Sequence, residues 1–187
     1  MMSIVIISGS PSARSRLSAI VEQVKAALAA EGQEWTEIAV RELPPADLLH
    51  AAFDSPAIAE AVGKVEQAGA VVIATPIYKA SYTGILKAFL DLLPQKGLER
   101  KIVLPVAIGG TIAHLLAIDY ALKPVLAALG ARHVLGGVFV QDTHVTWSEQ
   151  GQAVLDAETG ARLDGAVKEL VRERRASAGA AAVAQRV

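Results

Sequence analysis

The chain has 187 residues, with 18 lysines and arginines against 19 aspartates and glutamates, and it contains no cysteine. The near balance of charge excludes the broad positive field that attracts nucleic acid. The lack of cysteine excludes disulfides, thiolate metal sites and a cysteine nucleophile, and the four histidines show no metal-ligand spacing. Hydrophobic residues make up 52% of the chain, yet none of its apolar runs approaches the roughly 18 residues of a membrane span. Because the first residues carry neither a basic region nor a cleavage site, we expect a cytoplasmic protein without a membrane or nucleic-acid partner.

Five short apolar runs alternate with longer segments of helical period, which is typical of a parallel sheet wrapped by helices. The expected strands are Ile4 to Ile7, Trp35 to Val40, Ala70 to Ala74, Ile102 to Ala107, and His133 to Val140. The expected helices are Arg16 to Glu31, Ser55 to Gln67, Tyr82 to Leu93, Ile112 to Leu129, and Leu163 to Arg175. Right-handed crossovers in this order predict a flavodoxin-like three-layer α/β/α sandwich, with a five-stranded parallel sheet of order 2-1-3-4-5.

The domain organisation is simple. Residues 1–175 are expected to form a single domain, since no internal repeat and no linker composition interrupts them. The remaining segment, 176–187, is rich in alanine and has too little bulk to build core, so we expect a disordered tail.

The loop after the first strand, Ser8 to Ser18, is small and rich in hydroxyl groups, and it opens onto a helix. Free backbone N–H groups and the helix dipole make such a helix start a site for an anion, and a monophosphate fits it. The loop lacks the motifs of a triphosphate P-loop, of a dinucleotide site and of a hydrolase elbow. The alternative is that Ser15 only caps the helix and that Arg14 and Arg16 are solvated.

Two further loops follow the third and fourth strands. In Thr75-Pro76-Ile77-Tyr78 the proline stiffens the backbone, so the loop could pair with the polar edge of a planar ring while Ile77 and Tyr78 cover its face. Alternatively, Pro76 only ends the strand. The glycines of Gly109-Gly110-Thr111 allow backbone N–H groups to approach a flavin ring, although an ordinary glycine turn has the same composition.

The helix from Ile112 to Leu129 contains an internal proline, Pro124. Proline lacks an N–H, so the carbonyl of Tyr120 loses its usual partner four residues on. We therefore expect a kink or a π-bulge near Tyr120, at a functional or subunit surface. A simple proline kink with a half-buried Tyr120 is the alternative.

Four separated stretches of the chain share their pattern and order with one known family. They are Gly9 to Pro11, Thr75 to Lys87, Leu90 to Pro94, and Gly109 to Leu116. Together they resemble the NAD(P)H-dependent FMN reductases. The segment from His114 to Leu126 is especially similar to the alkanesulfonate-system subgroup, whose members carry a π-helical insertion with a tyrosine at the subunit interface. That tyrosine corresponds to Tyr120.

The resemblance implies an enzyme that transfers hydride from NADPH or NADH to FMN, with no catalytic side chain and no metal, because the cofactor carries the chemistry. It implies that FMN binds loosely as a substrate and that reduced flavin passes to a flavin-dependent monooxygenase, in alkanesulfonate desulfonation. It also implies a homodimer or homotetramer, and it gives no role to Arg14. The cofactor-binding residues that it implies are Ser10, Ser15, Arg16 and Ser18 for the phosphate, and Pro76, Ile77, Tyr78, Gly109, Gly110 and Thr111 for the ring.

Two other functions stay open on the sequence. One is a quinone or azo-compound reductase of the same fold that keeps its FMN bound. The other is a flavodoxin-type electron carrier, against which the near-neutral charge speaks, since such carriers are strongly acidic.

Overall fold

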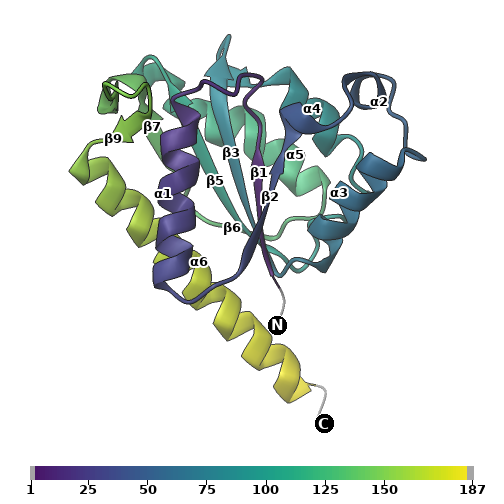
Figure 1. The fold of residues 1–187 in the computed structure, drawn as a ribbon. Coiled ribbons are helices and arrows are strands. Elements are labelled where there is room, and N and C mark those ends of the chain that lie inside the picture. The colour runs from purple at the N-terminus through teal and green to yellow at the C-terminus, as the bar shows by residue number, and fades with distance from the viewer. Residues whose placement is uncertain (1–2, 185–187) are drawn as a thin grey trace.

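A seven-stranded, mainly parallel sheet forms the centre of the protein in a computed structural model that describes residues 3–184 (Figure 1). The strands run in the order β2 (Trp35–Ala39), β1 (Ile4–Ser8), β3 (Ala70–Tyr78), β5 (Ile102–Gly109) and β6 (His133–Val134). In addition, β4 (Ser81–Tyr82) pairs with β3, and β7 (Val138–Gln141) pairs with β5. The predicted α/β fold is therefore present, but the predicted count of five strands was wrong. The expected order 2-1-3-4-5 becomes β2-β1-β3-β5, followed by the separate strands β6 and β7.

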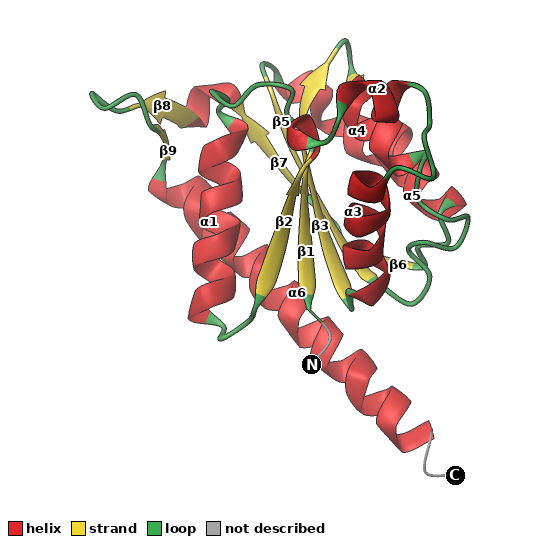
Figure 2. Ribbon diagram, turned by 45° about the vertical axis from the view of Figure 1, so that its right-hand side comes forward, coloured by secondary structure: helices red, strands yellow, loops and turns green. Residues whose placement is uncertain are grey.

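Helices cover both faces of the sheet (Figure 2). One face packs against α1 (Leu17–Ala30) and α6 (Ala157–Ala184), and the other against α3 (Pro56–Gln67), α4 (Gly84–Leu90) and α5 (Lys123–Ala128). Strand β1 shows why: Ile4 and Ile6 join the first core, whereas Val5 and Ile7 join the second. Successive side chains of a strand point to opposite faces, so a continuous apolar run serves two helix layers at once. The short η1 (Val40–Glu42) and α2 (Pro45–Leu49) lie against α4.

The fifth predicted strand is divided into β6 and β7, and the break lies opposite Pro105 of β5. Ile102 and Val103 pair with β6, and pairing resumes only from Val106 onward with β7. Proline offers no N–H to a sheet ladder, which favours a break in the neighbouring strand. Gly137 bridges the break with a φ of 86°, and a Cβ on it would lie 3.0 Å from the carbonyl oxygen of Pro105.

The third strand is longer than expected. Pro76 does not end it, because β3 continues to Tyr78 and turns directly into β4. The turn residues Lys79 and Ala80 both have positive φ, at 50° and 63°. These values are typical of a tight type I′ hairpin turn, which normally carries asparagine or glycine. Lysine and alanine do not signal such a turn, so the hairpin was not predicted.

The predicted helix from Ile112 to Leu129 is divided into three parts. It consists of a 3₁₀ turn, η2 (Ile112–Leu116), a π-helix, η3 (Ile118–Leu122), and α5. The π-helix contains Tyr120, so the predicted π-bulge is confirmed.

The C-terminal part contains elements that the sequence did not indicate. After η4 (Asp142–His144), strands β8 (Val145–Trp147) and β9 (Ala153–Leu155) form a separate antiparallel hairpin beside α1. Helix α6 then extends to Ala184, so the expected disordered tail is helical up to that residue, and 185–187 lie outside the described residues. Alanine is the best helix former, and no proline interrupts this segment. Within residues 3–184, no helix is both long and apolar enough to cross a membrane.

Candidate active site

The loops after β1 and β3 are joined by buried hydrogen bonds at the carboxyl edge of the sheet. Thr83 caps α4 by accepting from the N–H of Leu86 at 3.3 Å, and its hydroxyl donates to the carbonyl oxygen of Gly9 at 2.5 Å. The N–H of Thr83 donates in turn to Thr75 Oγ1 at 3.3 Å. A Cβ on Gly9 would lie 2.8 Å from the Cβ of Leu86, which leaves no room for any other residue. The first loop is therefore held in place by α4.

The first loop presents free donors. No described residue accepts a hydrogen bond from the backbone N–H of Ala13, Arg14 or Ser15. Ser10 is buried at 2% exposure and its hydroxyl bonds to Ser12, while Ser15 accepts from the N–H of Leu17 at 3.2 Å. Ser15 thus pairs the first backbone N–H of α1, while the N-cap position belongs to Arg16, whose side chain makes no capping hydrogen bond. Unpaired N–H groups ahead of a helix form a binding place for an anion.

Arg16 and Ser18 lie at the same helix start, and they differ in where they point. Ser18 donates to the carbonyl oxygen of Ser15 at 2.7 Å. Arg16 turns toward the β8–β9 hairpin, where its Nε donates to the carbonyl oxygen of Val145 at 3.2 Å. Within the described residues, its two Nη groups donate no hydrogen bond. Arg16 is therefore not simply solvated, and it keeps donors for a ligand.

The third loop exposes only one of its three predicted ring-binding residues. Pro76 and Ile77 are buried, and Ile77 packs in a small cluster with Ala107 and Phe139. Tyr78 is 52% exposed at the start of the hairpin turn. The expectation that Ile77 covers an open face is therefore wrong, because the strand continues and turns this side chain into the core.

The fourth loop has a tight backbone approach. A Cβ on Gly109 would lie 3.1 Å from His114 Nδ1 and 3.2 Å from Phe139. Gly110 and Thr111 are exposed, and no described residue accepts from their backbone N–H groups. His114 Nδ1 is buried and has no hydrogen-bond partner among the described residues. Unpaired polar groups of this kind mark a place where a ligand completes the bonding.

Tyr120 takes no part in the buried hydrogen bonds that join the first and third loops. It is 78% exposed on η3, beside three other exposed apolar side chains, Ile112 at 60%, Leu115 at 43% and Leu116 at 55%. Within the part of the chain that the structure describes, these four residues form an apolar surface on η2 and η3, which we call the π-helix surface. Large contiguous apolar surfaces indicate contact with another molecule.

Two cavities border the site. One, of about 260 Å³, lies under the first loop and is lined by Ser10, Ser12, Ser15, Lys25 and Arg41, among others. The second, of about 470 Å³, is mainly apolar and is lined by Pro11, Tyr78, Thr83 and residues of η1, α2 and α4. Both lie between elements that meet at the carboxyl edge of the sheet.

Sequence reasoning missed several residues of this edge. Thr83 and Thr75 are buried, and they join the first and third loops. The threonine before Gly84 is a helix-capping signal that could have identified Thr83. No local signal indicates that Trp147 lies beside Arg14 and Arg16, because the contact joins segments distant in the chain.

Comparison with known proteins gives consistent results. The model of the family described as NADPH-dependent FMN reductase matches residues 2–145. A protein of Pseudomonas putida called FMN reductase (NADPH) is 50% identical over 148 residues, covering 79% of this chain and 75% of its own. A protein of the same description from Escherichia coli K12 is 47% identical over 144 residues, covering 77% and 75%. The solved apo structure of the NADH:FMN oxidoreductase EMOB has a TM-score of 0.80 at 39% identity, covering 91% of this chain and 88% of that one.

The family match runs from β1 to the start of β8 and includes all three loops at the carboxyl edge. The identity is high enough, and continuous over enough of the chain, to carry the activity together with the fold. The chain therefore belongs to the NADPH-dependent FMN reductase family and is an NAD(P)H:FMN oxidoreductase, which uses FMN together with NADPH or NADH.

Proposed function

We propose that FMN binds across the carboxyl edge of the sheet, with its phosphate at the first loop and its ring at the fourth. The phosphate would take the free N–H groups that precede α1, with the hydroxyls of Ser10, Ser15 and Ser18 and the Nη groups of Arg16 around them. A charge-assisted bond to an anion is about twice as strong as a neutral one. The single observation that carries the proposal is this run of unpaired donors on a loop fixed by Thr83.

The ring would lie against Gly109, Gly110 and Thr111, with Tyr78 and the strand of Pro76 and Ile77 on its other side. The tight approach at Gly109 supports this placement, since a side chain there would fill the space a ring edge needs. His114 Nδ1, buried without a partner among residues 3–184, supports it too. Bound FMN supplies the redox chemistry. The free N–H groups of Gly110 and Thr111 would stabilise negative charge on the ring's polar edge.

Preorganisation is the contribution of this chain. The Thr75–Thr83–Gly9 hydrogen bonds hold the first and third loops before any ligand arrives. A fixed site loses less conformational entropy on binding, and it orients the nicotinamide and the flavin for hydride transfer. No side chain needs to act as a nucleophile.

We further propose that reduced flavin leaves the enzyme and supplies a flavin-dependent monooxygenase, in alkanesulfonate desulfonation. The exposed position of Tyr78 supports an open site from which the flavin can leave. A cytoplasmic location fits the supply of NADPH and NADH there.

The activity is tested by following the oxidation of NADPH and of NADH at 340 nm with FMN, FAD and riboflavin in turn. We expect turnover that depends on added FMN, and flavin that separates from the protein on gel filtration. Flavin that stays bound while a quinone or azo compound is reduced would instead identify an FMN-bound reductase. No oxidation of either nucleotide with FMN would reject the proposal.

We also propose that the chain forms a homodimer or homotetramer through the π-helix surface. Its four exposed apolar side chains include Tyr120, for which the resemblance to the alkanesulfonate-system subgroup implies a position at a subunit interface. A second copy would remove this surface from water. Sedimentation or light scattering measures the assembly size, and a monomer at micromolar concentration would contradict the proposal.

A further inference from the structure

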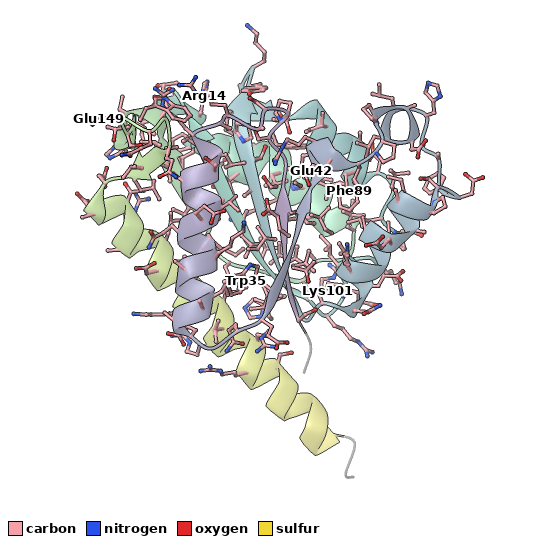
Figure 3. All side chains as sticks on the ribbon, viewed as in Figure 1. Arg14, Trp35, Glu42, Phe89, Lys101 and Glu149 are labelled. Carbon is pink, nitrogen blue, oxygen red and sulfur yellow. The ribbon has the colours of Figure 1, made fainter. Side chains whose placement is uncertain are left out.

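Two arginines converge on one tryptophan beside the first loop. The guanidinium carbon of Arg14 lies 5.1 Å from the centroid of the Trp147 ring, and that of Arg16 lies 5.9 Å from it. Figure 3 shows Arg14 at the upper corner of the molecule, where α1 begins. Neither arginine has a carboxylate within 4 Å among the described residues, whereas Arg41 and Arg172 do. Two cations that share one ring without a counter-charge favour the binding of an anion.

The tryptophan is held by a well-bonded hairpin. The N–H of Ser148 donates to the carbonyl oxygen of Gln152 at 2.8 Å and closes the turn. At the base of the hairpin, Asp156 Oδ2 lies 2.6 Å from His144 Nδ1. The bond from Arg16 Nε to Val145 joins the hairpin to the helix start. The Trp147 ring is therefore fixed next to Arg14 before a ligand binds.

A cleft opens at this cluster. It has a volume of about 610 Å³ and is lined by Arg14, Ser18, Glu22, Trp147, Gln152 and the small residues Ala13, Ala19, Gly151 and Ala153. The Glu22 carboxylate is paired with Lys25 Nζ at 2.8 Å. A neighbouring cleft of about 650 Å³ continues along α1 toward β9 and α6, where Asp156 and Asp164 line it. Glu22 lines both clefts, whereas Arg14 lines only the first, and Asp156 and Asp164 line only the second. An anionic ligand fits only the end that carries Arg14.

We propose that this cleft binds the adenosine 2′-phosphate end of NADPH, with Arg14 on the 2′-phosphate and Trp147 against the adenine. The inference rests on the proposed function, in which a nicotinamide nucleotide reaches the neighbouring flavin site. Guanidinium groups bind phosphate through two parallel hydrogen bonds, and an arginine is the residue that accommodates a 2′-phosphate in nucleotide sites. A purine stacks on an aromatic ring or a guanidinium plane, and the Gln152 amide lies within the same cleft to meet its polar edge.

Arg14 and Arg16 have different tasks in this arrangement. Arg16 begins α1 and is anchored to Val145, so it lies between the two phosphate positions. The Arg14 side chain makes no hydrogen bond to any described residue. Among the described residues, its guanidinium group makes a cation–π contact with the Trp147 ring. Trp147 and Gln152 lie beyond residue 145, where the family match ends. A substitution of the Arg14 side chain can therefore change nucleotide preference while its backbone N–H, which faces the proposed flavin phosphate, stays in place.

Binding tests the inference without turnover. The chain has two tryptophans, so Trp35→Phe leaves Trp147 as the only one. Adenosine 2′,5′-bisphosphate and 5′-AMP are titrated into this protein, with Trp147 emission and calorimetry as readouts. We expect the bisphosphate to quench Trp147 and to bind about tenfold to hundredfold more tightly than AMP, since one charge-assisted bond is worth that ratio. Arg14→Gln should remove the difference, and Arg14→Lys should restore part of it.

Arg132→Gln is the matched control, because Arg132 is an exposed arginine next to β6, at the opposite edge of the sheet. It should leave both titrations unchanged. In steady-state assays, Arg14→Gln should raise the KM for NADPH relative to the KM for NADH by about tenfold or more. Trp147→Ala should weaken the binding of the bisphosphate. If this variant unfolds the hairpin, Trp147→Phe replaces it, and because phenylalanine keeps a stacking ring it should keep most of the binding.

Three results would overturn the inference. Equal affinity for adenosine 2′,5′-bisphosphate and 5′-AMP would contradict the 2′-phosphate site. An unchanged preference for the bisphosphate in Arg14→Gln would contradict the role of Arg14. Weaker FMN binding in Arg14→Gln, with the bisphosphate unaffected, would assign Arg14 to the flavin phosphate. Each of these can occur in an active enzyme, whereas a failure of the proposed function shows as no nucleotide oxidation with FMN.

Discussion

The two sides of the candidate site are held in opposite ways. The loops after β1 and β3 meet through buried hydrogen bonds. Thr83, whose hydroxyl joins them, is 2% exposed. The segments after β5 and β7 lie at the surface, where Tyr120 is exposed and Trp147 is partly exposed. The difference indicates a division of work. The part that would hold the flavin is continuous with the core, and the parts that would meet a second copy or the nucleotide lie on the surface.

Gly9→Ala should break the buried side of this comparison most strongly. Its Cβ would lie 2.8 Å from the Cβ of Leu86 and 3.3 Å from the carbonyl oxygen of Ala74. We expect the free energy of unfolding to fall by about 3 kcal/mol, at the upper end for overpacking, and FMN binding to weaken. Urea denaturation and FMN titration measure the two effects. Gly63→Ala is the control, because nothing lies within 4 Å of a Cβ there and α3 should gain slightly.

Thr83→Val should have the next largest effect. Valine keeps the shape but removes the hydroxyl that donates to Gly9 and caps α4. The loss of a cap and of a buried partner should cost about 2 kcal/mol of unfolding free energy. Thr83→Ser keeps the hydroxyl and should recover most of the loss. Equal stability of the valine and serine variants in urea would mean that the loops are not held by this bond.

Acid should loosen the hairpin on the surface side before the core unfolds. The N–H of Thr159, and after it His144, hold the pKa of the Asp156 carboxyl below its ordinary value of 3.8, against partial desolvation. A lowered pKa means that ionised Asp156 stabilises the start of α6, through Thr159, and the base of the hairpin, through His144. That contribution is complete above pH 3.8 and is lost as the pH falls below it.

The measurement is Trp147 emission in the Trp35→Phe protein, followed against far-UV circular dichroism as the pH is lowered. Asp156→Asn should show the loosened emission already at pH 7, whereas Glu158→Gln, in the same turn of α6, should not. Emission and circular dichroism that change together would show that the hairpin is no less stable than the sheet.

Tyr120→Ala should have the smallest effect on folding. The side chain is 78% exposed, so the free energy of unfolding should change by no more than about 0.5 kcal/mol. Assembly size or flavin retention should change instead, because the π-helix surface loses its largest apolar group. Light scattering and gel filtration with FMN check this. Unchanged assembly, FMN affinity and turnover would contradict the proposed role of this surface.

The sequence predicted those features that depend on short-range patterns. Apolar runs of strand length predicted β1 and β5 closely, because a buried parallel strand is apolar on both faces. Pro124 predicted the π-helix around Tyr120, since the missing N–H acts only a few residues away. The three loops at the carboxyl edge were found for the same reason, as each follows its own strand.

The features it did not predict depend on distant partners. The β3–β4 hairpin turns at Lys79 and Ala80 although neither is a residue that favours positive φ. The division of the fifth strand is set by Pro105 on its neighbour, and the direction of Arg16 is set by Val145. Such contacts are decided by tertiary packing, which a local pattern does not contain.

The hydrogen bonds of Thr83 also restrict which substitutions related sequences can accumulate. The Thr83 hydroxyl donates to the carbonyl oxygen of Gly9 and accepts from the N–H of Leu86, and the backbone N–H of Thr83 donates to the hydroxyl of Thr75. A change at any one of these positions alters what the other two can tolerate, so they should show epistasis, with coupling energies of about 0.5–3 kcal/mol in double-mutant cycles. Variants of this protein should therefore change Gly9, Thr75 and Thr83 together or keep all three.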